Sequence, residues 1–196
     1  MANAIGEAIQ LGEFRAGEWL RQIDLEERFG ATRFDVRAAL DELAVRQTIQ
    51  HVPNRGYRVA APDEGTLDGI RAVRSILEPA AAPLIVARTD DAALDRLRDL
   101  ATRFGAAVRS GDHADQSRTN RDFHRALYAL SGNPVLEETI WSLRARSRGA
   151  AMTRWRSVEA MVRSDVEHHE MLDALAARDA ARLAAVIGRH IDGDRK

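Results

Sequence analysis

The sequence predicts a mainly α-helical protein in two parts: a small helix-and-hairpin unit at the N-terminus, followed by an antiparallel α-helical bundle. Apolar residues recur with a helical period through most of the chain, whereas alternating, strand-like segments are confined to 48–52 and 57–59. A stretch with Pro62 and Gly65 follows the second of these segments. Proline and glycine interrupt regular structure, so this stretch is typical of a connection between domains.

The composition narrows the class of protein. The chain has 196 residues, 45% of them hydrophobic and 30% charged, which is typical of a soluble protein with one domain or two small ones. It has no cysteine, which excludes disulfides and thiolate zinc sites and fits a reducing cytosol. No apolar run approaches the ~18 residues of a membrane span, and the N-terminus lacks the basic region of a signal peptide. We therefore expect a cytoplasmic protein that does not associate with membranes.

The N-terminal unit is expected to begin with two short helices. The first covers 2–10, and the second carries an apolar stripe of Leu25 and Phe29 and ends at Gly30. Glycine ends a helix readily because it adopts the left-handed conformation at little cost.

A third helix is predicted directly after this turn. Thr32 is a good N-cap, and Asp35 three residues later completes a capping box. The buried face of this helix is formed by regularly spaced apolar residues, namely Val36, Leu40 and Leu43. Arg33, Phe34 and Arg37 are left on the outer face of its first two turns.

A helix-turn-helix followed by a glycine-tipped hairpin is a winged DNA-binding module, which binds double-stranded DNA with its second helix in the major groove. The net charge does not indicate DNA binding, since residues 1–62 carry eight Arg against nine acidic residues. The prediction therefore rests on the geometry of the motif. Asp35 either only caps the helix or also accepts a hydrogen bond from a cytosine amine. The residues expected to contact DNA are Thr32, Arg33, Phe34, Arg37, Arg55 and Gly56.

The second part is predicted to be all-helical. We expect a first domain at 1–62, a linker at 63–66 and a helical domain at 67–196. The helical segments of this domain are expected at 67–88 with interruptions at Pro79 and Pro83, 90–110, 113–131, 133–156, 157–178 and 179–192.

Three histidines and one asparagine of this bundle are placed to converge. Asn120 and His124 are four residues apart and share a helix face. His168 lies eleven residues before Asp179, which opens the last helix, and His190 lies eleven residues after it. In an antiparallel helix pair both histidines are ~16 Å from the turn, at ~1.5 Å per residue, and so lie level with each other.

These four residues predict a site for a divalent metal such as Zn or Ni. Neutral imidazole is a good ligand for such ions, and the cores of helical bundles commonly hold them. The alternative is an ordinary packing role, because a single helical histidine is more often exposed or hydrogen-bonded than a ligand. The amide of Asn120 is the weakest of the four ligands.

The N-terminal motifs resemble those of the GntR family of bacterial regulators. The family pattern is matched in order by Gly12, Gly17 and Leu20, by Thr32-Arg33-Phe34-Asp35-Val36-Arg37-Ala38-Ala39-Leu40, and by Asn54-Arg55-Gly56. The bundle resembles the FCD type, the effector-binding domain of the FadR subfamily. That resemblance rests on Val73-Arg74 with Glu78-Pro79, on residues 120–127, on Ser131-Gly132-Asn133-Pro134, on residues 167–175 and on His190-Ile191.

The resemblance implies a ligand-responsive transcription regulator, most often a repressor, that binds a palindromic operator as a homodimer. It also implies a divalent metal on the three histidines and Asn120, and a small carboxylate effector. A carboxylate would fill open metal positions and pair with arginines. Arg74 matches the Arg-x-x-x-Glu motif of the family and is the first candidate to bind the effector. The alternative is that Arg74 only forms an ion pair with Glu78, four residues later on the same helix. Arg144 and Arg148, four residues apart, are further candidates.

A metal-dependent hydrolase of small acids with a degenerate winged domain is the alternative function. Three histidines with open positions can activate water, and Glu167 or Glu170 would act as the base. The sequence has no H-E-x-x-H spacing and no nucleophile or phosphate-loop motif, so we expect no enzyme. Exposure of residues 32–37 and 54–56 would favour the regulator, whereas a buried Arg33 in a monomer would favour the hydrolase.

Overall fold

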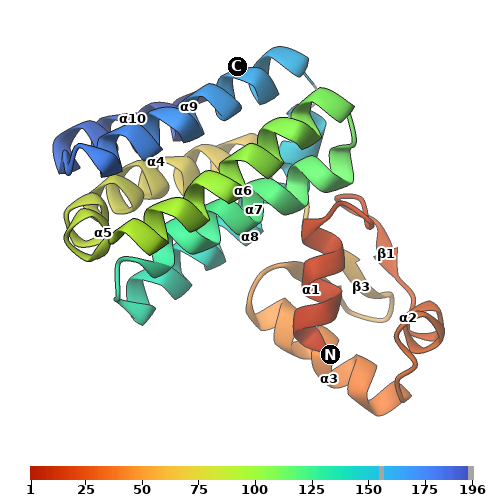
Figure 1. Cartoon of the computed structure of the whole chain (residues 1–196). Coiled ribbons are helices and arrows are strands. Elements are labelled where there is room, and N and C mark those ends of the chain that lie inside the picture. Colours follow the sequence, from red (N-terminus) through yellow and green to blue (C-terminus); the bar gives the residue numbers. More distant parts are fainter. Residues whose placement is uncertain (155–156, 194–196) are drawn as a thin grey trace. The chain divides into compact units, whose positions relative to one another are not determined.

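The computed structural model describes residues 1–154 and 157–193, with side chains described for residues 1–147 and 157–193. Two compact units are found: Met1–Leu67 with Arg144–Met152, and Asp68–Leu143 with Thr153–Lys196. The described residues are mainly helical, as predicted, and Figure 1 shows the arrangement of the elements within each unit. Within these residues, no helix is long and apolar enough to cross a membrane.

The first unit has the predicted three helices and hairpin. The helices are α1 (Ala2–Gln10), α2 (Gln22–Phe29) and α3 (Arg33–Val45). The strands are β1 (Trp19–Leu20), β2 (Ile49–Val52) and β3 (Gly56–Val59), in the antiparallel order β1-β3-β2. Strand β1 was not predicted, because two residues carry no periodicity and its pairing with β3 depends on the fold.

Local signals in the sequence set the bounds of α2 and α3. Gly30 ends α2 in the left-handed conformation, with φ 60°. The Thr32 hydroxyl caps α3: its oxygen accepts from the Asp35 backbone N–H at 3.2 Å, and its O–H donates to the Asp35 carboxylate at 2.7 Å. Val36 and Leu40 are fully buried in the core of this unit, so α3 turns the predicted face inward.

The predicted linker at 63–66 overlaps the first turn of α4 (Glu64–Ala80). The Asp63 carboxylate accepts a hydrogen bond from the Thr66 backbone N–H at 2.7 Å and so caps the new helix. This interaction holds the pKa of Asp63 below its usual range. The connection without helix or strand is therefore 60–63.

The second unit is the predicted antiparallel bundle. The expected helix at 67–88 is divided: α4 continues through Pro79 to Ala80, and Pro83 lies in the first turn of α5, where its missing N–H costs nothing. The remaining helices are α5 (Ala82–Arg88), α6 (Asp91–Ser110), α7 (His113–Ala129), α8 (Pro134–Arg154), α9 (Val158–Ala176) and α10 (Ala180–Gly193).

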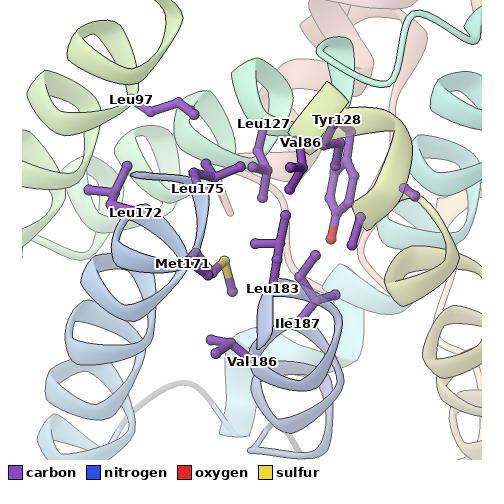
Figure 2. Packing of buried hydrophobic residues seen from close by; sticks show 14 of the residues in the cluster. Val86, Leu97, Leu127, Tyr128, Met171, Leu172, Leu175, Leu183, Val186 and Ile187 are labelled. Carbon is purple, nitrogen blue, oxygen red and sulfur yellow. The ribbon is translucent and has the colours of Figure 1, made fainter. Parts of the chain in front are cut away.

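Buried hydrophobic side chains from α5, α6, α7, α8, α9 and α10 form the bundle core, part of which Figure 2 shows. Leu183 and Ile187 of α10 project toward Met171 of α9 and Tyr128 of α7 in this view. Helices α9 and α10 pack along each other as a hairpin, as Figure 1 also shows. This hairpin fixes the relative height of His168 and His190.

Candidate metal centre and DNA-binding surface

The bundle brings together the three histidines that the sequence placed level with one another. His124 lies on α7, His168 on α9 and His190 on α10, and all three are buried. Their ligand nitrogens lie within 4.8 Å of one another. The Nε2 atom of His124 is 3.1 Å from Nε2 of His190 and 3.3 Å from Nε2 of His168.

These distances suit ligands of one small ion. Two ligand nitrogens that lie about 2.0–2.1 Å from the same ion, with about 90–109° between the two bonds, are themselves about 2.8–3.4 Å apart. Both Nε2 separations fall within this range. A neutral imidazole presents one lone pair, so a shared cation gives all three rings a common partner.

Asn120, the fourth predicted ligand, lies one turn before His124 on α7 and is only 3% exposed. Its Oδ1 atom has no hydrogen-bond partner among the described residues. Leaving a buried acceptor unsatisfied costs about 1–3 kcal/mol. A cation beside His124 would satisfy this oxygen, so the residues present fit a divalent metal.

The hydroxyl oxygen of Ser164 is also buried and has no hydrogen-bond partner among the described residues. Ser164 was not among the residues predicted from the sequence. It lies one turn before His168 on α9, just as Asn120 lies one turn before His124. A lone serine on a helix carries no signal, but its spacing of four from His168 was visible in the sequence.

Helix α6 packs against both α7 and α9 near these residues. The Gln116 side chain, one turn before Asn120, donates to the Ala107 carbonyl of α6 at 3.3 Å. Two residues earlier in α6, the backbone of Gly105 is so close to the Asp165 carboxylate that a Cβ would lie 2.9 Å from it. Helix α6 therefore contacts the segments of α7 and α9 that precede His124 and His168.

Glu167 orients His190. Its carboxylate is 2.7 Å from Nδ1 of His190, and both side chains are buried. With the Nδ1 proton donated to Glu167, the lone pair remains on Nε2, facing the other histidines. Glu167, considered above as the base of a hydrolase, is thus engaged in holding a histidine.

Aromatic rings fix His168. The ring of Phe123 stacks on it with 4.1 Å between centroids and an interplanar angle of 22°, and the Phe104 ring is tilted against it at 4.7 Å. These contacts limit rotation of the imidazole and keep water from its faces.

Arg74 forms an ion pair with Glu78, the alternative role that the sequence analysis gave it. Its Nε donates to Glu78 Oε1 at 2.6 Å, and both side chains are buried. The Tyr128 hydroxyl donates to the other Glu78 oxygen at 2.5 Å, and the Tyr128 ring is stacked on His124 with 6.1 Å between centroids. Glu78 and Tyr128 therefore connect Arg74 with the histidine cluster.

The structure describes the side chain of one of the other two predicted arginines. Arg144 lies on α8 and is buried. The side chain of Arg148 lies outside the described residues.

The predicted DNA-contacting residues of α3 are on its exposed face. Thr32, Arg33, Phe34 and Arg37 are all exposed, and Phe34 is 81% exposed. The Thr32 hydroxyl is used in the cap of α3. Exposure of Arg33 is the observation that favours the regulator over the hydrolase.

The wing tip has the backbone that its glycine indicates. Gly56 has φ 97° and Asn54 has φ 61°, and the Arg55 N–H donates to the Val52 carbonyl at 3.0 Å across the turn. The Arg55 guanidinium lies over the Trp19 ring, 4.8 Å from its centroid. The role of Trp19 was missed because strand β1 was missed.

Arg21, Arg33 and Arg55 line one open hollow of about 510 Å³, between the start of α2, the start of α3 and the wing. Its lining among the described residues includes no Asp or Glu. Arg21 forms an ion pair with Asp24 at 3.8 Å, so Arg33 and Arg55 supply most of the positive charge here. Such a concentration of guanidinium groups attracts nucleic-acid phosphates. This feature supplies the basic surface that the net charge did not reveal.

Replacing Gly56 with valine is expected to weaken DNA binding and to change global stability little. No atom lies within 4 Å of an added Cβ, so the effect arises from φ 97°, which strains a β-branched residue by about 1–3 kcal/mol. The wing tip would relax and displace Arg55. A gel shift and a thermal unfolding curve measure both effects. Gly111→Val is the control, with φ 78° and open space in the bundle. Unchanged DNA affinity would show that 53–56 is only a hairpin turn.

Two family models match this chain. The model described as "Bacterial regulatory proteins, gntR family" matches residues 1–59, and the model described as "FCD domain" matches residues 69–193. Together they cover both parts of the fold described above.

Named relatives agree with this match. The Nta operon transcriptional regulator of Aminobacter aminovorans is 27% identical over 180 residues, which cover 91% of this chain and 83% of the relative. The HTH-type transcriptional repressor GlaR of Escherichia coli K12 is 29% identical over 188 residues, which cover 92% and 86%.

Solved structures share the fold. Escherichia coli McbR/YncC superposes with a TM-score of 0.90 at 24% identity, covering 97% of this chain and 91% of that one. A transcriptional regulator of Rhodococcus sp. RHA1, described as GntR, gives a TM-score of 0.81 at 22% identity with the same coverage. The chain therefore belongs to the gntR family of bacterial regulatory proteins, in the FadR-like group with an FCD domain, and is a DNA-binding transcriptional regulator.

Proposed function

We propose that this regulator is a repressor that binds a palindromic operator as a homodimer in the cytoplasm and responds to a small carboxylate bound beside a divalent metal. The observation that carries the proposal is the convergence of three buried imidazoles in a chain with an exposed recognition helix. No residue is assigned a catalytic role.

The DNA-binding half of the proposal uses α3 and the wing. Arg33, Phe34 and Arg37 enter the major groove at the start of α3, beside the cap formed by Thr32. Arg55 and Gly56 meet the minor groove or the backbone, where arginine suits a narrow, negative groove. A single winged domain buries too little surface for tight specific binding, so two copies on a two-fold symmetric site are required.

The metal-binding half uses His124, His168 and His190, with the Asn120 oxygen as a fourth ligand. When bound, the ion supplies a Lewis-acid centre with open positions for carboxylate oxygens. We assign the open positions to the neighbourhood of the Asn120 and Ser164 oxygens, because each is buried without a hydrogen-bond partner among the described residues and lies one helical turn from a histidine. In this proposal the Ser164 hydroxyl donates a hydrogen bond to a bound carboxylate.

Arg74 supplies the positive charge that a buried carboxylate needs. A guanidinium has five N–H donors in a planar fork, and the Nε bond to Glu78 uses one of them. An effector carboxylate that binds Arg74 alters the ion pair between Arg74 and Glu78. Because Tyr128 donates to Glu78 and stacks on His124, a shift of Glu78 also affects the position of His124. Arg144 and Arg148 remain predictions as further carboxylate-binding residues.

Thermal shift with a panel of sugar acids, hydroxy acids and dicarboxylates tests the effector proposal. An effector should stabilise the metal-loaded protein by RT ln(1 + [L]/Kd), which is about 2.7 kcal/mol at a concentration of 100 Kd. Either a chelator or Arg74→Ala should abolish this gain. Arg98→Ala is the control, since Arg98 is exposed and pairs with Asp95 at the surface of α6. Stabilisation that survives both changes would place the ligand elsewhere and leave the metal and Arg74 with structural roles.

A further inference from the structure

We propose that Tyr57 and Asp41 are positioning residues that hold Arg37 of the recognition helix in place for DNA before the operator is bound. This inference rests on the proposed role of Arg37 in operator binding. It gives a role in operator binding to two residues that are not among those expected to contact DNA directly.

Tyr57 connects the wing with the recognition helix. It lies in β3, the central strand of the sheet, paired with Leu20 of β1 on one side and His51 of β2 on the other. Tyr57 is only 5% exposed, and the His51 ring packs against its ring with 4.8 Å between centroids. Its position is therefore fixed by both neighbouring strands.

The Tyr57 hydroxyl donates to the Asp41 carboxylate of α3 at 2.5 Å, between residues 16 apart in the sequence. A hydrogen bond to a charged acceptor is about twice as strong as one between neutral groups. The two elements expected to contact DNA, α3 and the wing, are thereby tied together by a directional interaction as well as by apolar packing.

Arg37 belongs to the same cluster. It is one turn before Asp41 on α3, so the two side chains lie on one helix face. Burial and the Asp41 carboxylate raise the pKa of the Tyr57 hydroxyl, while the positive charge of Arg37 opposes that rise. Arg37 thus lies within electrostatic reach of the Tyr57 hydroxyl, one helical turn from the Asp41 carboxylate that accepts from this hydroxyl.

Holding Arg37 in this cluster lowers the cost of DNA binding. A free arginine side chain loses much rotamer freedom when it is fixed against a base. A side chain that is already ordered loses less, so the operator complex is tighter. Binding to non-specific DNA relies on phosphate contacts, which a mobile side chain can also make. Ordering Arg37 therefore raises the affinity for non-specific DNA little.

The test is a double-mutant cycle in full-length protein, measured with operator and with unrelated DNA. Tyr57→Phe keeps the buried ring and removes only the hydroxyl. It should weaken operator binding about three- to ten-fold, with little change for unrelated DNA. Combined with Arg37→Ala, it should cause no further loss, because its effect acts through Arg37. Combined with Arg33→Ala, the control on the same helix, its effect should add in full.

Asp41→Ala provides a second route to the same result, since Asp41 is exposed and its replacement leaves the core intact. Operator binding by Tyr57→Phe and Asp41→Ala equal to wild type would overturn the inference while leaving the role of Arg37 standing. A loss that adds in full to Arg37→Ala would also overturn it. An Arg37→Ala protein with wild-type operator affinity would refute both the role of Arg37 and the inference.

Discussion

Replacing His124 with alanine is expected to abolish tight binding of a divalent metal and to lower the thermal midpoint of the metal-loaded protein to that of the chelated wild type. The Nε2 atom of His124 is the one within 3.1 and 3.3 Å of the other two, so its loss removes the nitrogen that links the cluster. We expect affinity for Zn or Ni to fall by more than about 100-fold, since even the loss of an outer partner of a ligand costs about 10–100-fold. Metal content and competition with a chelator measure this.

Two further variants calibrate that result. Glu167→Gln should weaken metal binding by about 10–100-fold, because His190 loses its carboxylate partner but keeps its ring. His169→Ala should leave the metal affinity unchanged, because the His169 side chain is exposed and lies beside Asp165 rather than in the histidine cluster. A His124→Ala protein with the metal content of wild type would contradict the proposed site, as would a wild type that binds no divalent metal.

Replacing Arg33 or Arg37 with alanine is expected to cost ~1–3 kcal/mol of specific operator binding, about 5–150-fold in affinity. Both side chains are exposed on the first two turns of α3, the part of a recognition helix that reaches base edges and phosphates. Unrelated DNA should lose less affinity if the contacts are to bases. Anisotropy titrations at several salt concentrations separate these cases.

Arg46→Ala is the matched control for these two variants. Arg46 is the C-cap of α3, at the opposite end of the helix, where it forms an ion pair with Glu42 and donates to Asn3 at 3.2 Å. Its replacement should leave operator affinity unchanged. If Arg33→Ala and Arg37→Ala also bind the operator like wild type, these arginines are solvated surface residues and another element reads the DNA.

Local signals were sufficient for much of the fold. The cap of α3 at Thr32 and the glycine at position 30 were visible in the sequence and set the same bounds in the structure. The convergence of His168 and His190 followed from equal distances to Asp179, because a helix hairpin converts sequence distance directly into height.

Contacts between distant segments were not predictable in this way. Strand β1 depends on pairing with β3, and the position of Arg55 over Trp19 depends on that strand. The Tyr57–Asp41 bond joins residues in different elements, each of which is ordinary in its own segment. Glu167 was noticed as a potential base, and only the packing of α9 on α10 directs it to His190 instead.

A DNase I footprint on the intergenic DNA beside the gene of this protein, with the sedimentation coefficient measured under the same conditions, tests the central claim most directly. A dimeric repressor should protect a two-fold symmetric site whose half-sites are centred one DNA turn apart, ~34 Å, or a multiple of it. Arg37→Ala should lose this protection at the same protein concentration. A monomer at micromolar concentration with an asymmetric footprint, or no protected segment at all, would contradict the account.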